Sequence, residues 1–598
     1  MSSAEELTGT PSAPHKAAST PLPAAGARLD RLRARLPAVR VGPQHLALAG
    51  VLAFSAVLNT NRLSQNGYSN VYYSAGVKSM MRSLHNFFFV SFDPGGLVTV
   101  DKPPLGLWVQ AASAKVFGFS AMSLLLPEAI LGVLTVAVLY YIVARRFGWI
   151  AGIASALALA VFPSFVAVSR DSGVDPLMIL LMLLACGAAI RAAETGRWRT
   201  IIWCAVLVGL AFNTKTLAAY LVVPGIAVAF LLCAPGSLSR RAVQLAVAGV
   251  VLLAVSFAWM AAVELTPASK RPFVGSSTNN TELGLTFEYN GLGRVQGQVG
   301  GPGHIPRRGG AVARYHLAES PRQRAFLNAA KAGQPAAQKK LASAVAAATP
   351  HRPHRESQPI SFPGPTGLLR IFGRGLGDQG GWYVPLALFG LLGIAVLLLS
   401  DWLGGRAARA PGDGRMPPPG QAPAAAGPPA GDRVPAAAAS AGPAPPAAEG
   451  QAASAADAAT AGGGGLADAE RGDWRRDPRL ATTIALGGWF LVEAVVLSLS
   501  HGIVHPYYAS ALAPGAAAMA GAGSVAFVQL ARAQALNWRL VAIALVGSAV
   551  AGTVWAQVVI LHKQNYMHWF VPVLLLGAAA GATVVVLWRR MAPAAMAL

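Results

Sequence analysis

Charged residues are scarce in this sequence. Only 12% of its 598 residues are Asp, Glu, Lys or Arg, whereas soluble domains carry about 25%. Hydrophobic residues make up 54% of the chain, and its mean hydropathy is +0.47. This shortage of charge excludes an ordinary soluble domain and indicates a membrane protein.

Cysteine is also rare, and common nucleotide-binding and hydrolase motifs are missing. The three cysteines, Cys186, Cys204 and Cys233, all lie within apolar runs, where a free thiol behaves as a small hydrophobic group. They do not form a disulfide framework, and no Cys/His spacing indicates zinc. The sequence contains no P-loop, Rossmann fingerprint or serine elbow.

Acidic residues are about half as frequent as basic ones, 25 against 48, and the net charge is +23. Lys and Arg gather at the ends of apolar runs and in two polar inserts. Cytoplasmic loops retain such charge beside anionic lipid head groups. Because no nucleic-acid recognition motif accompanies the charge, we expect membrane lipids as partners and no nucleic acid.

Apolar sequence is abundant, in runs of about 20 residues that can each cross a bilayer as a helix. We therefore predict an all-α polytopic membrane protein with about 12 transmembrane helices. The predicted crossings are 44–61, 120–144, 149–168, 175–192, 199–214, 216–235, 242–264, 381–402, 480–500, 507–530, 538–561 and 568–588.

The segment 104–117 is apolar, but it has only 14 residues, fewer than a crossing requires. If it does not cross, six arginine clusters, from Arg145–Arg146 to Arg589–Arg590, fall on the side of the basic N-terminus. The positive-inside rule favours that arrangement. We therefore predict an interfacial helix at 104–117 and both chain ends in the cytoplasm.

This topology defines the expected domains. They are a disordered basic cytoplasmic tail at 1–42, an N-terminal transmembrane catalytic module at 43–264 with an outer loop at 62–119, an extracytoplasmic insert at 265–380, a transmembrane helix at 381–402, a disordered Ala/Pro/Gly linker at 403–478 and a C-terminal transmembrane module at 479–598.

Ionisable groups gather on the predicted outer face. Each has an ordinary explanation: an interfacial ion pair for Arg170 and Asp171, a helix N-terminus for Asp175, snorkelling for Lys215. Their convergence with Asp93, Asp101 and Lys102 on one face favours a catalytic site. An ammonium group at the membrane surface suits a lipid-linked phosphate.

Several short motifs can be read along the chain. They are Asn70-Val-Tyr-Tyr73, Val77-Lys-Ser-Met80, His85-Asn-Phe-Phe-Phe89, Asp93-Pro-Gly-Gly96, Asp101-Lys-Pro-Pro-Leu-Gly106, Phe212-Asn-Thr-Lys215, Arg271-Pro-Phe-Val-Gly275, Tyr289-Asn-Gly-Leu-Gly-Arg294 and His505-Pro-Tyr-Tyr508. As a set they resemble family 39 glycosyltransferases of the PMT and ArnT type, and above all the bacterial mannosyltransferase-like branch of the YkcB type. The resemblance covers about residues 45 to 590, except the two low-complexity inserts.

The resemblance implies a GT-C membrane fold in the bacterial plasma membrane, with its active site on the extracytoplasmic side. Such enzymes take a sugar, here a hexose or pentose, from a polyprenyl-phosphate donor, and we expect a lipid, glycan or protein of the cell envelope as acceptor. We predict Asp101 and Asp93 as catalytic candidates. The predicted substrate-binding residues are Lys102, Arg170, Asp171, Asp175, Lys215, Tyr72, His505 and Tyr508.

The sequence departs from the family at one position. Many relatives carry an acidic residue early in the first outer loop as the base, but this loop reads Asn66-Gly-Tyr-Ser-Asn-Val-Tyr-Tyr73. Asp93 and Asp101 are the available replacements. No metal site is predicted, although a divalent cation among Asp93, Asp101 and Asp171 stays an open alternative.

A transporter or flippase of a lipid-linked sugar is the main alternative function, because its fold would also have many spans. Transporters, however, place charged groups near the bilayer centre, often in two matched halves, whereas here the charges lie at helix ends on one side. A non-catalytic scaffold would leave the ionisable groups unexplained.

Overall fold

The computed structural model describes residues 42–277, 279–296, 365–407, 473–502 and 504–581. The predicted tail, most of the predicted linker and a large part of the predicted insert lie outside the described residues. The chain divides into two units, residues 1–46 and 47–598, and only the start of helix α2 is described in the first. The description below therefore concerns the second unit.

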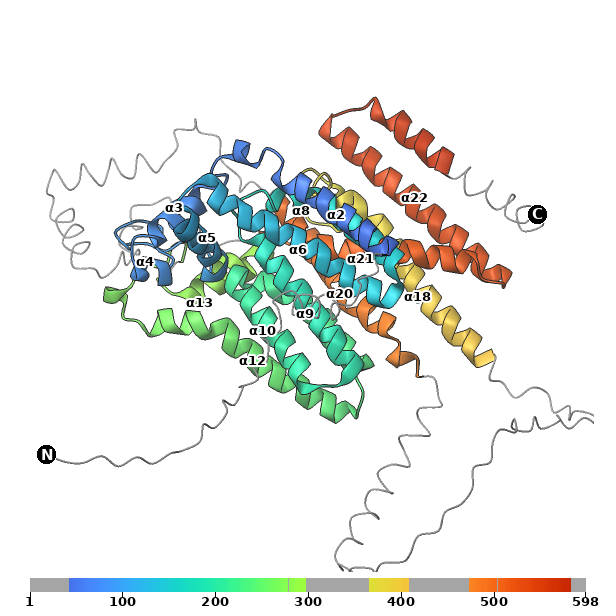
Figure 1. Cartoon of the computed structure of the whole chain (residues 1–598), viewed down its shortest axis with the longest axis horizontal. Coiled ribbons are helices and arrows are strands. Elements are labelled where there is room, and N and C mark those ends of the chain that lie inside the picture. The colour runs from blue at the N-terminus through green and yellow to red at the C-terminus, as the bar shows by residue number, and fades with distance from the viewer. Residues whose placement is uncertain (1–41, 278, 297–364, 408–472, 503, 582–598) are drawn as a thin grey trace, which may run out of the picture. The chain divides into compact units, whose positions relative to one another are not determined.

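Helices account for nearly all regular structure in the described residues (Figure 1). The longer ones are α2 (Pro43–Thr60), α3 (Val71–Met80), α5 (Pro104–Phe117), α6 (Ala121–Phe147), α7 (Trp149–Ala160), α9 (Asp175–Thr195), α10 (Trp198–Lys215), α11 (Val223–Cys233), α12 (Leu238–Leu265), α18 (Val384–Ala407), α20 (Pro478–Leu499), α21 (Ala509–Ala531) and α22 (Leu536–Gln564). The short ones are η1 (Leu63–Asn66), α4 (Leu84–Phe88), α8 (Pro163–Val168), η2 (Thr216–Val222), η3 (Ala268–Lys270), α13 (Glu282–Gly284), η4 (Leu285–Leu292), α14 (Gly293–Gln296), η5 (Leu368–Phe372), η6 (Gly381–Tyr383), η7 (Trp474–Arg476) and η8 (Pro506–Tyr508).

Nine helical segments among the described residues are long and apolar enough to cross a membrane. Within the same residues, extended pairing is limited to two isolated bridges, Ser91–Thr99 and Val98–Phe273. The predicted all-α, multi-pass membrane protein is thus confirmed.

The twelve predicted crossings and the nine long segments differ because three predicted runs are short or joined helices. One long segment, Trp198–Cys233, contains both α10 and α11. The chain breaks between them at Thr216, whose φ of 52° is left-handed and ends α10. The run 149–168 forms α7 and α8, and Phe570–Gly581 is a shorter apolar helix.

Helix α5 begins and ends where the interfacial helix was predicted. It has 14 residues, which at about 1.5 Å per residue is well short of the roughly 30 Å hydrocarbon layer. Pro104 begins the helix, and its missing N–H costs nothing there because the N–H groups of a first turn have no partner within the helix. At its other end, Gly118 has a φ of 80°, a conformation that favours glycine over other residues.

A small hydrophobic core of its own supports the first outer loop. Val90 and Val100 from the loop pack with Leu107 of α5, Trp259 of α12 and Val274, all buried. The indole N–H of Trp259 donates to the Phe88 carbonyl at 2.9 Å, so α12 holds α4 in place. The loop is therefore a packed structure on which side chains can be positioned.

The C-terminal helices approach each other closely through glycine. A Cβ atom added to Gly523 of α21 would lie 2.2 Å from the Cα of Gly390 in α18. Small residues allow such close backbone contact between membrane helices, where packing rather than the hydrophobic effect drives association.

The predicted topology can be tested by labelling single cysteines in intact cells. The native cysteines are buried and would be replaced by alanine. We expect the exposed positions in G95C and K270C to react with an impermeant maleimide from outside, and R197C and Q534C only after permeabilisation. Labelling of G95C and R197C from the same side would contradict a non-crossing α5.

Candidate active site

The loop that leads into α5 carries a buried pair of opposite charges, Asp101 and Lys102. The Lys102 ammonium donates to Asp101 Oδ2 at 2.8 Å and to Asn290 Oδ1 at 3.0 Å. The Asn290 amide donates in turn to the Asp101 carbonyl at 2.8 Å, and the Asp101 N–H donates to the Tyr72 hydroxyl oxygen at 3.1 Å. Pro103 and Pro104 follow directly and restrict the backbone. The loop is therefore held from both sides.

The second carboxylate oxygen of Asp101 has different surroundings. Oδ1 is buried and has no hydrogen-bond partner among the described residues. Burial lowers the pKa of Lys102, while the neighbouring Asp101 carboxylate opposes that shift. An unpartnered carboxylate oxygen is a site that can accept a hydrogen bond or a proton.

Lys215 and Asp175 form a second buried ion pair. Lys215 ends α10 and Asp175 begins α9, and these helices pack side by side (Figure 1). The Lys215 ammonium also faces two aromatic rings, with its Nζ 4.8 Å from the centroid of Tyr507 and 4.6 Å from that of Tyr508. Cation–π contacts of this kind gain strength when they are desolvated.

His505 lies against the two aromatic rings that face Lys215. Its ring stacks on Tyr507 with centroids 5.2 Å apart. The pKa of His505 is lowered to about 4, first by burial and then by the positive charges of Arg294, Lys215 and Lys102. The imidazole is therefore neutral at physiological pH and can form hydrogen bonds but supplies no positive charge.

The structure thus brings together seven predicted site residues at one end of the helices: Tyr72, Asp101, Lys102, Asp175, Lys215, His505 and Tyr508. Between Asp101 and Asp175 the chain passes through α5, α6 and the α7–α8 pair. If α6 and the α7–α8 pair each cross the membrane and α5 does not, the two residues return to the same side, as this arrangement requires. Whether these residues bind substrate stays a prediction.

Asp93 occupies a different kind of position. Its Oδ1 accepts from the Gly95 N–H at 2.9 Å, and its Oδ2 accepts from the N–H groups of Leu97 and Val98 at 2.8 and 2.9 Å. Both oxygens therefore shape the turn that precedes Asp101. Such contacts favour a structural contribution of Asp93.

Arg170 and Asp171 contact the first outer loop. The Arg170 guanidinium donates to the carbonyls of Leu58 at 2.5 Å and Asn61 at 2.8 Å, at the end of α2. Asp171 Oδ1 accepts from the Ser69 hydroxyl at 2.6 Å. Burial raises the pKa of Asp171, and the Ser69 hydrogen bond opposes the rise. The expected ion pair between Arg170 and Asp171 does not form in the structure, where the two side chains bind separate partners.

Three further residues join the site without having been predicted. Asn290 bridges Asp101 and Lys102, the guanidinium of Arg294 lies 4.5 Å from the Tyr289 ring centroid, and Tyr507 faces Lys215. All three residues belong to the Tyr289–Arg294 and His505–Tyr508 motifs, which the sequence had singled out. Nothing in the sequence, however, placed the Tyr289–Arg294 motif against Asp101.

The carboxylates considered for a divalent cation do not gather. Asp93 caps a turn, Asp101 pairs with Lys102, and Asp171 binds Ser69. Within the described ranges, no group of three or more His, Cys, Asp or Glu side chains could hold a metal ion.

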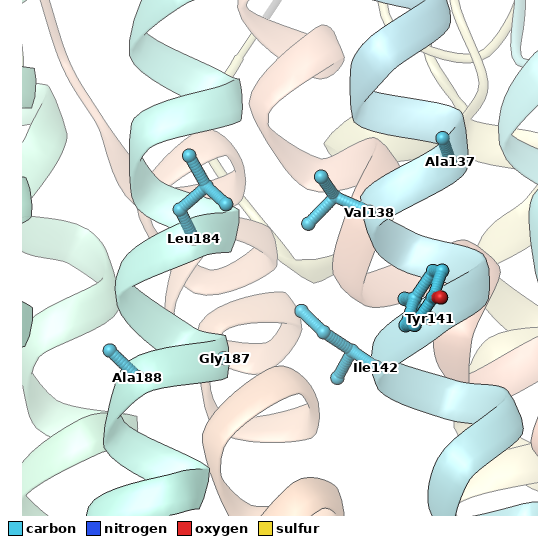
Figure 2. A pocket seen from close by; sticks show the side chains of 7 residues that line it. All are labelled: Ala137, Val138, Tyr141, Ile142, Leu184, Gly187 and Ala188. Atoms are coloured by element: carbon cyan, nitrogen blue, oxygen red, sulfur yellow. The ribbon is translucent and has the colours of Figure 1, made fainter. Parts of the chain in front are cut away.

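An apolar groove of about 390 Å³ lies between α6 and α9, away from these residues (Figure 2). Its walls are Ala137, Val138, Tyr141, Ile142, Leu184, Gly187 and Ala188. It contains none of the predicted site residues and no ionisable group apart from the Tyr141 phenol, so it is not the candidate active site.

Comparison with known proteins agrees with the resemblance read from the motifs. Residues 101–260 match the family model of dolichyl-phosphate-mannose-protein mannosyltransferases. Two proteins of Bacillus subtilis (strain 168) that are named as candidate mannosyltransferases are similar: YycA is 35% identical over 380 residues, and YkcB is 40% identical over 258 residues. The predicted family resemblance is confirmed.

These alignments cover only part of each protein. They include 59% of this chain and 56% of YycA, and 43% of this chain and 36% of YkcB. The chain thus spans about half the length of the first relative and about a third of the second.

Solved membrane enzymes show a more distant likeness. ArnT from Cupriavidus metallidurans, bound to undecaprenyl phosphate, is 16% identical with a TM-score of 0.39, covering 90% of this chain and 75% of that one. The oligosaccharyltransferase AglB from Archaeoglobus fulgidus is 14% identical with a TM-score of 0.41, covering 88% and 56%.

The segment that supplies Asn290 also contains a buried acidic residue, Glu282. Its N–H donates to Glu264 Oε1 at 2.6 Å, and its own Oε1 has no hydrogen-bond partner among the described residues. The pKa of Glu282 is raised to about 8, mainly by burial and then by the Glu264 carboxylate, while Arg271 opposes the rise.

This raised pKa predicts a pH-dependent stability. The folded protein holds the Glu282 proton up to about pH 8, whereas the unfolded chain loses it near its ordinary pKa of 4.5. The contribution of Glu282 to the free energy of unfolding is fully present below pH 4.5. It is lost as the pH rises toward 8, and the total loss is on the order of a few kcal/mol. We expect E282Q to flatten the fall in melting temperature between those two values. An unchanged pH profile in E282Q would contradict the assignment.

Proposed function

We propose that this chain is a membrane glycosyltransferase that moves a sugar from a polyprenyl-phosphate donor to a cell-envelope acceptor at the extracytoplasmic face. The observation that carries the proposal is the gathering of two buried ion pairs, Asp101–Lys102 and Asp175–Lys215, at one end of the helices. The match of residues 101–260 to a mannosyltransferase family model supports it, because that segment contains both pairs.

In the proposed reaction, Asp101 accepts the proton of the acceptor hydroxyl while the acceptor oxygen attacks the anomeric carbon of the sugar. The bond between that carbon and the phosphate oxygen breaks, and its electron pair stays on the phosphate. Lys215 neutralises the charge that develops there. The ammonium pairs with Asp175 in the structure, so the phosphate would compete with that carboxylate.

Other groups support the two ends of the reaction. Lys102 binds Oδ2 of the Asp101 carboxylate, and Asn290 binds the Lys102 ammonium and the Asp101 main-chain carbonyl, so that Oδ1 is the oxygen left to take the proton. The neutral His505 and the Tyr508 hydroxyl are placed to form hydrogen bonds near Lys215. A hydrogen-bond donor aimed at a developing negative charge lowers the barrier without any change in protonation.

Transport of the intact lipid-linked sugar is the competing function. A transporter would use the same charges for binding only, without cleavage of the glycosidic bond. The one-sided position of the ion pairs, at helix ends rather than on broken helices in mid-membrane, favours transfer over transport.

The base assignment is tested with the full-length chain in lipid nanodiscs, supplied with labelled polyprenyl-phosphate mannose or pentose and extracted envelope lipids. We expect D101N to lower transfer by about 10²- to 10⁴-fold, because it removes the general base. D93N should lower the melting temperature more than the rate, since its carboxylate binds backbone N–H groups.

Two outcomes of that experiment, and one of a separate flux assay in proteoliposomes, would change the conclusion. Full activity in both variants would show that neither aspartate is the base. A large loss in D93N with an unchanged melting temperature would move the base to Asp93. Passage of uncleaved donor across liposomes, with no released polyprenyl phosphate, would favour the transporter.

Lys215 provides a second test. K215M removes the ammonium but keeps much of the side-chain volume, and it leaves Asp175 unpaired. We expect weaker donor binding and slower transfer together, each by about tenfold or more, because a charge-assisted contact to phosphate is lost. R191M, on the exposed cytoplasmic part of α9, is the control. Equal donor affinity in K215M and wild type would remove Lys215 from the phosphate site.

A further inference from the structure

Gln110 is a fully buried polar residue in the middle of α5, and the reaction described above does not use it. Its side-chain amide nitrogen donates to Glu128 Oε1 on α6 at 2.9 Å, to the Gly173 carbonyl at 2.8 Å and to the Ser172 carbonyl at 3.2 Å. One side chain therefore ties α5 both to α6 and to the loop that precedes Asp175 at the start of α9.

These hydrogen bonds satisfy only part of the buried Gln110–Glu128 pair. Gln110 Oε1 and Glu128 Oε2 have no hydrogen-bond partner among the described residues, and a buried polar atom without a partner costs free energy. Two apolar side chains of similar size would avoid that cost. The pair is therefore better explained by the backbone that it holds in place than by a gain in stability.

Gly106 lies one helical turn before Gln110, on the same face of α5. A Cβ atom added to Gly106 would lie 2.7 Å from Val174 Cγ1 and 3.3 Å from Thr214 Cγ2. Val174 and Thr214 directly precede the carboxylate and the ammonium residues of the second ion pair. The helix that follows the first ion pair thus packs directly against the backbone that carries the second.

The loop before α9 is also held from its other side, by the first outer loop. The Ser172 hydroxyl donates to the Tyr68 carbonyl at 2.9 Å and accepts from the Asn70 N–H at 3.2 Å. Because the main-chain carbonyl of Ser172 accepts from Gln110, the loop lies clamped between α5 and the start of α3. Loss of the Gln110 amide would release the loop on the α5 side.

We propose that Gln110 is a positioning residue: its amide group, held by Glu128, fixes the spacing between the Asp101–Lys102 pair and the Asp175–Lys215 pair. The inference rests on the proposed function, in which the base of the first pair and the ammonium of the second act on one sugar phosphate. A displacement of about 1 Å between reacting groups can cost about a hundredfold in rate. The spacing should therefore govern kcat more than it governs phosphate binding, for which Lys215 is sufficient.

The test compares Q110M with wild type as full-length chains in nanodiscs. Binding of undecaprenyl phosphate counts the folded sites, and transfer from labelled polyprenyl-phosphate mannose or pentose then gives the rate per site. We expect Q110M to lower kcat per site by about tenfold or more, and to leave the Kd of the probe close to that of wild type. A merely structural defect would lower the number of sites and leave the rate of each site unchanged.

Q244M is the matched control. Gln244 of α12 is also fully buried, and its amide donates to the Gly196 carbonyl at 2.9 Å, where α9 ends. The variant therefore removes the same kind of contact, from a glutamine side chain to the backbone beside α9, at the end of the helix away from the ion pairs. It should keep the rate per site of wild type.

Glu128 tests the same contact from the other side and covers the case in which Q110M does not fold. E128M removes the acceptor and should slow transfer per site in the same way. E128Q keeps an oxygen that can accept from the Gln110 amide and should restore most of the rate. An equal loss in E128Q and E128M would show that Glu128 does not act by holding Gln110, and would overturn the inference.

A double-mutant cycle with D101N shows whether Gln110 acts through the placement of the base. Once the Asp101 carboxylate is gone, Q110M should lower the residual rate by a much smaller factor than it lowers the rate of wild type. An equal factor in both backgrounds would overturn the inference. A wild-type rate per site in Q110M, or the same loss in Q110M and Q244M, would overturn it while the proposed function stands. If wild type neither binds the probe nor transfers sugar, the proposed function fails, and this inference fails with it.

Discussion

The ion pair between Lys215 and Asp175 is the interaction on which the rest of the candidate site depends. Each charge taken out of water costs several kcal/mol unless a partner and hydrogen bonds compensate. Helix geometry supplies part of the compensation, because Asp175 lies at the N-terminus of α9 and Lys215 at the C-terminus of α10. Both positions are the ones that a helix dipole favours for those charges. The aromatic rings of Tyr507 and Tyr508 complete the surroundings of the ammonium.

The second constraint is the docking of one loop on another. The segment around Phe273 pairs with the backbone of Leu97 and Thr99, and the Gly275 N–H donates to the Thr99 hydroxyl at 2.9 Å. This contact brings Asn290 over the Asp101–Lys102 pair. The first outer loop and the start of the insert therefore form one structure, in which movement of either loop would change the Asp101 carboxylate.

The motif residues in such a site do not all have the same task. The side chains of Asp93 and Arg170 form hydrogen bonds with backbone groups, so they shape the loops that carry other side chains. Asp101 and Lys215 instead pair with side chains of opposite charge. The proposed division is thus between residues that build the loops and residues that set the charge at the site.

The sequence by itself determined the class of protein, the family resemblance and the helical elements. Long apolar runs can satisfy their backbone in a bilayer only as helices, and Pro103–Pro104 with Gly118 marked both ends of α5. Local signals of this kind need no distant partner. The sequence also supplied most members of the site, because ionisable residues at membrane-helix ends are rare enough to be noticed.

Only the tertiary structure decided which of those residues meet. Nothing in the sequence separates Asp93, which caps a turn through both oxygens, from Asp101, which keeps one oxygen unpartnered. Asn290 reaches Asp101 from 189 positions away, and Asp175 pairs with Lys215 across 40 positions. Such contacts depend on how helices and loops pack across long sequence separations, and no local pattern of residues encodes that packing.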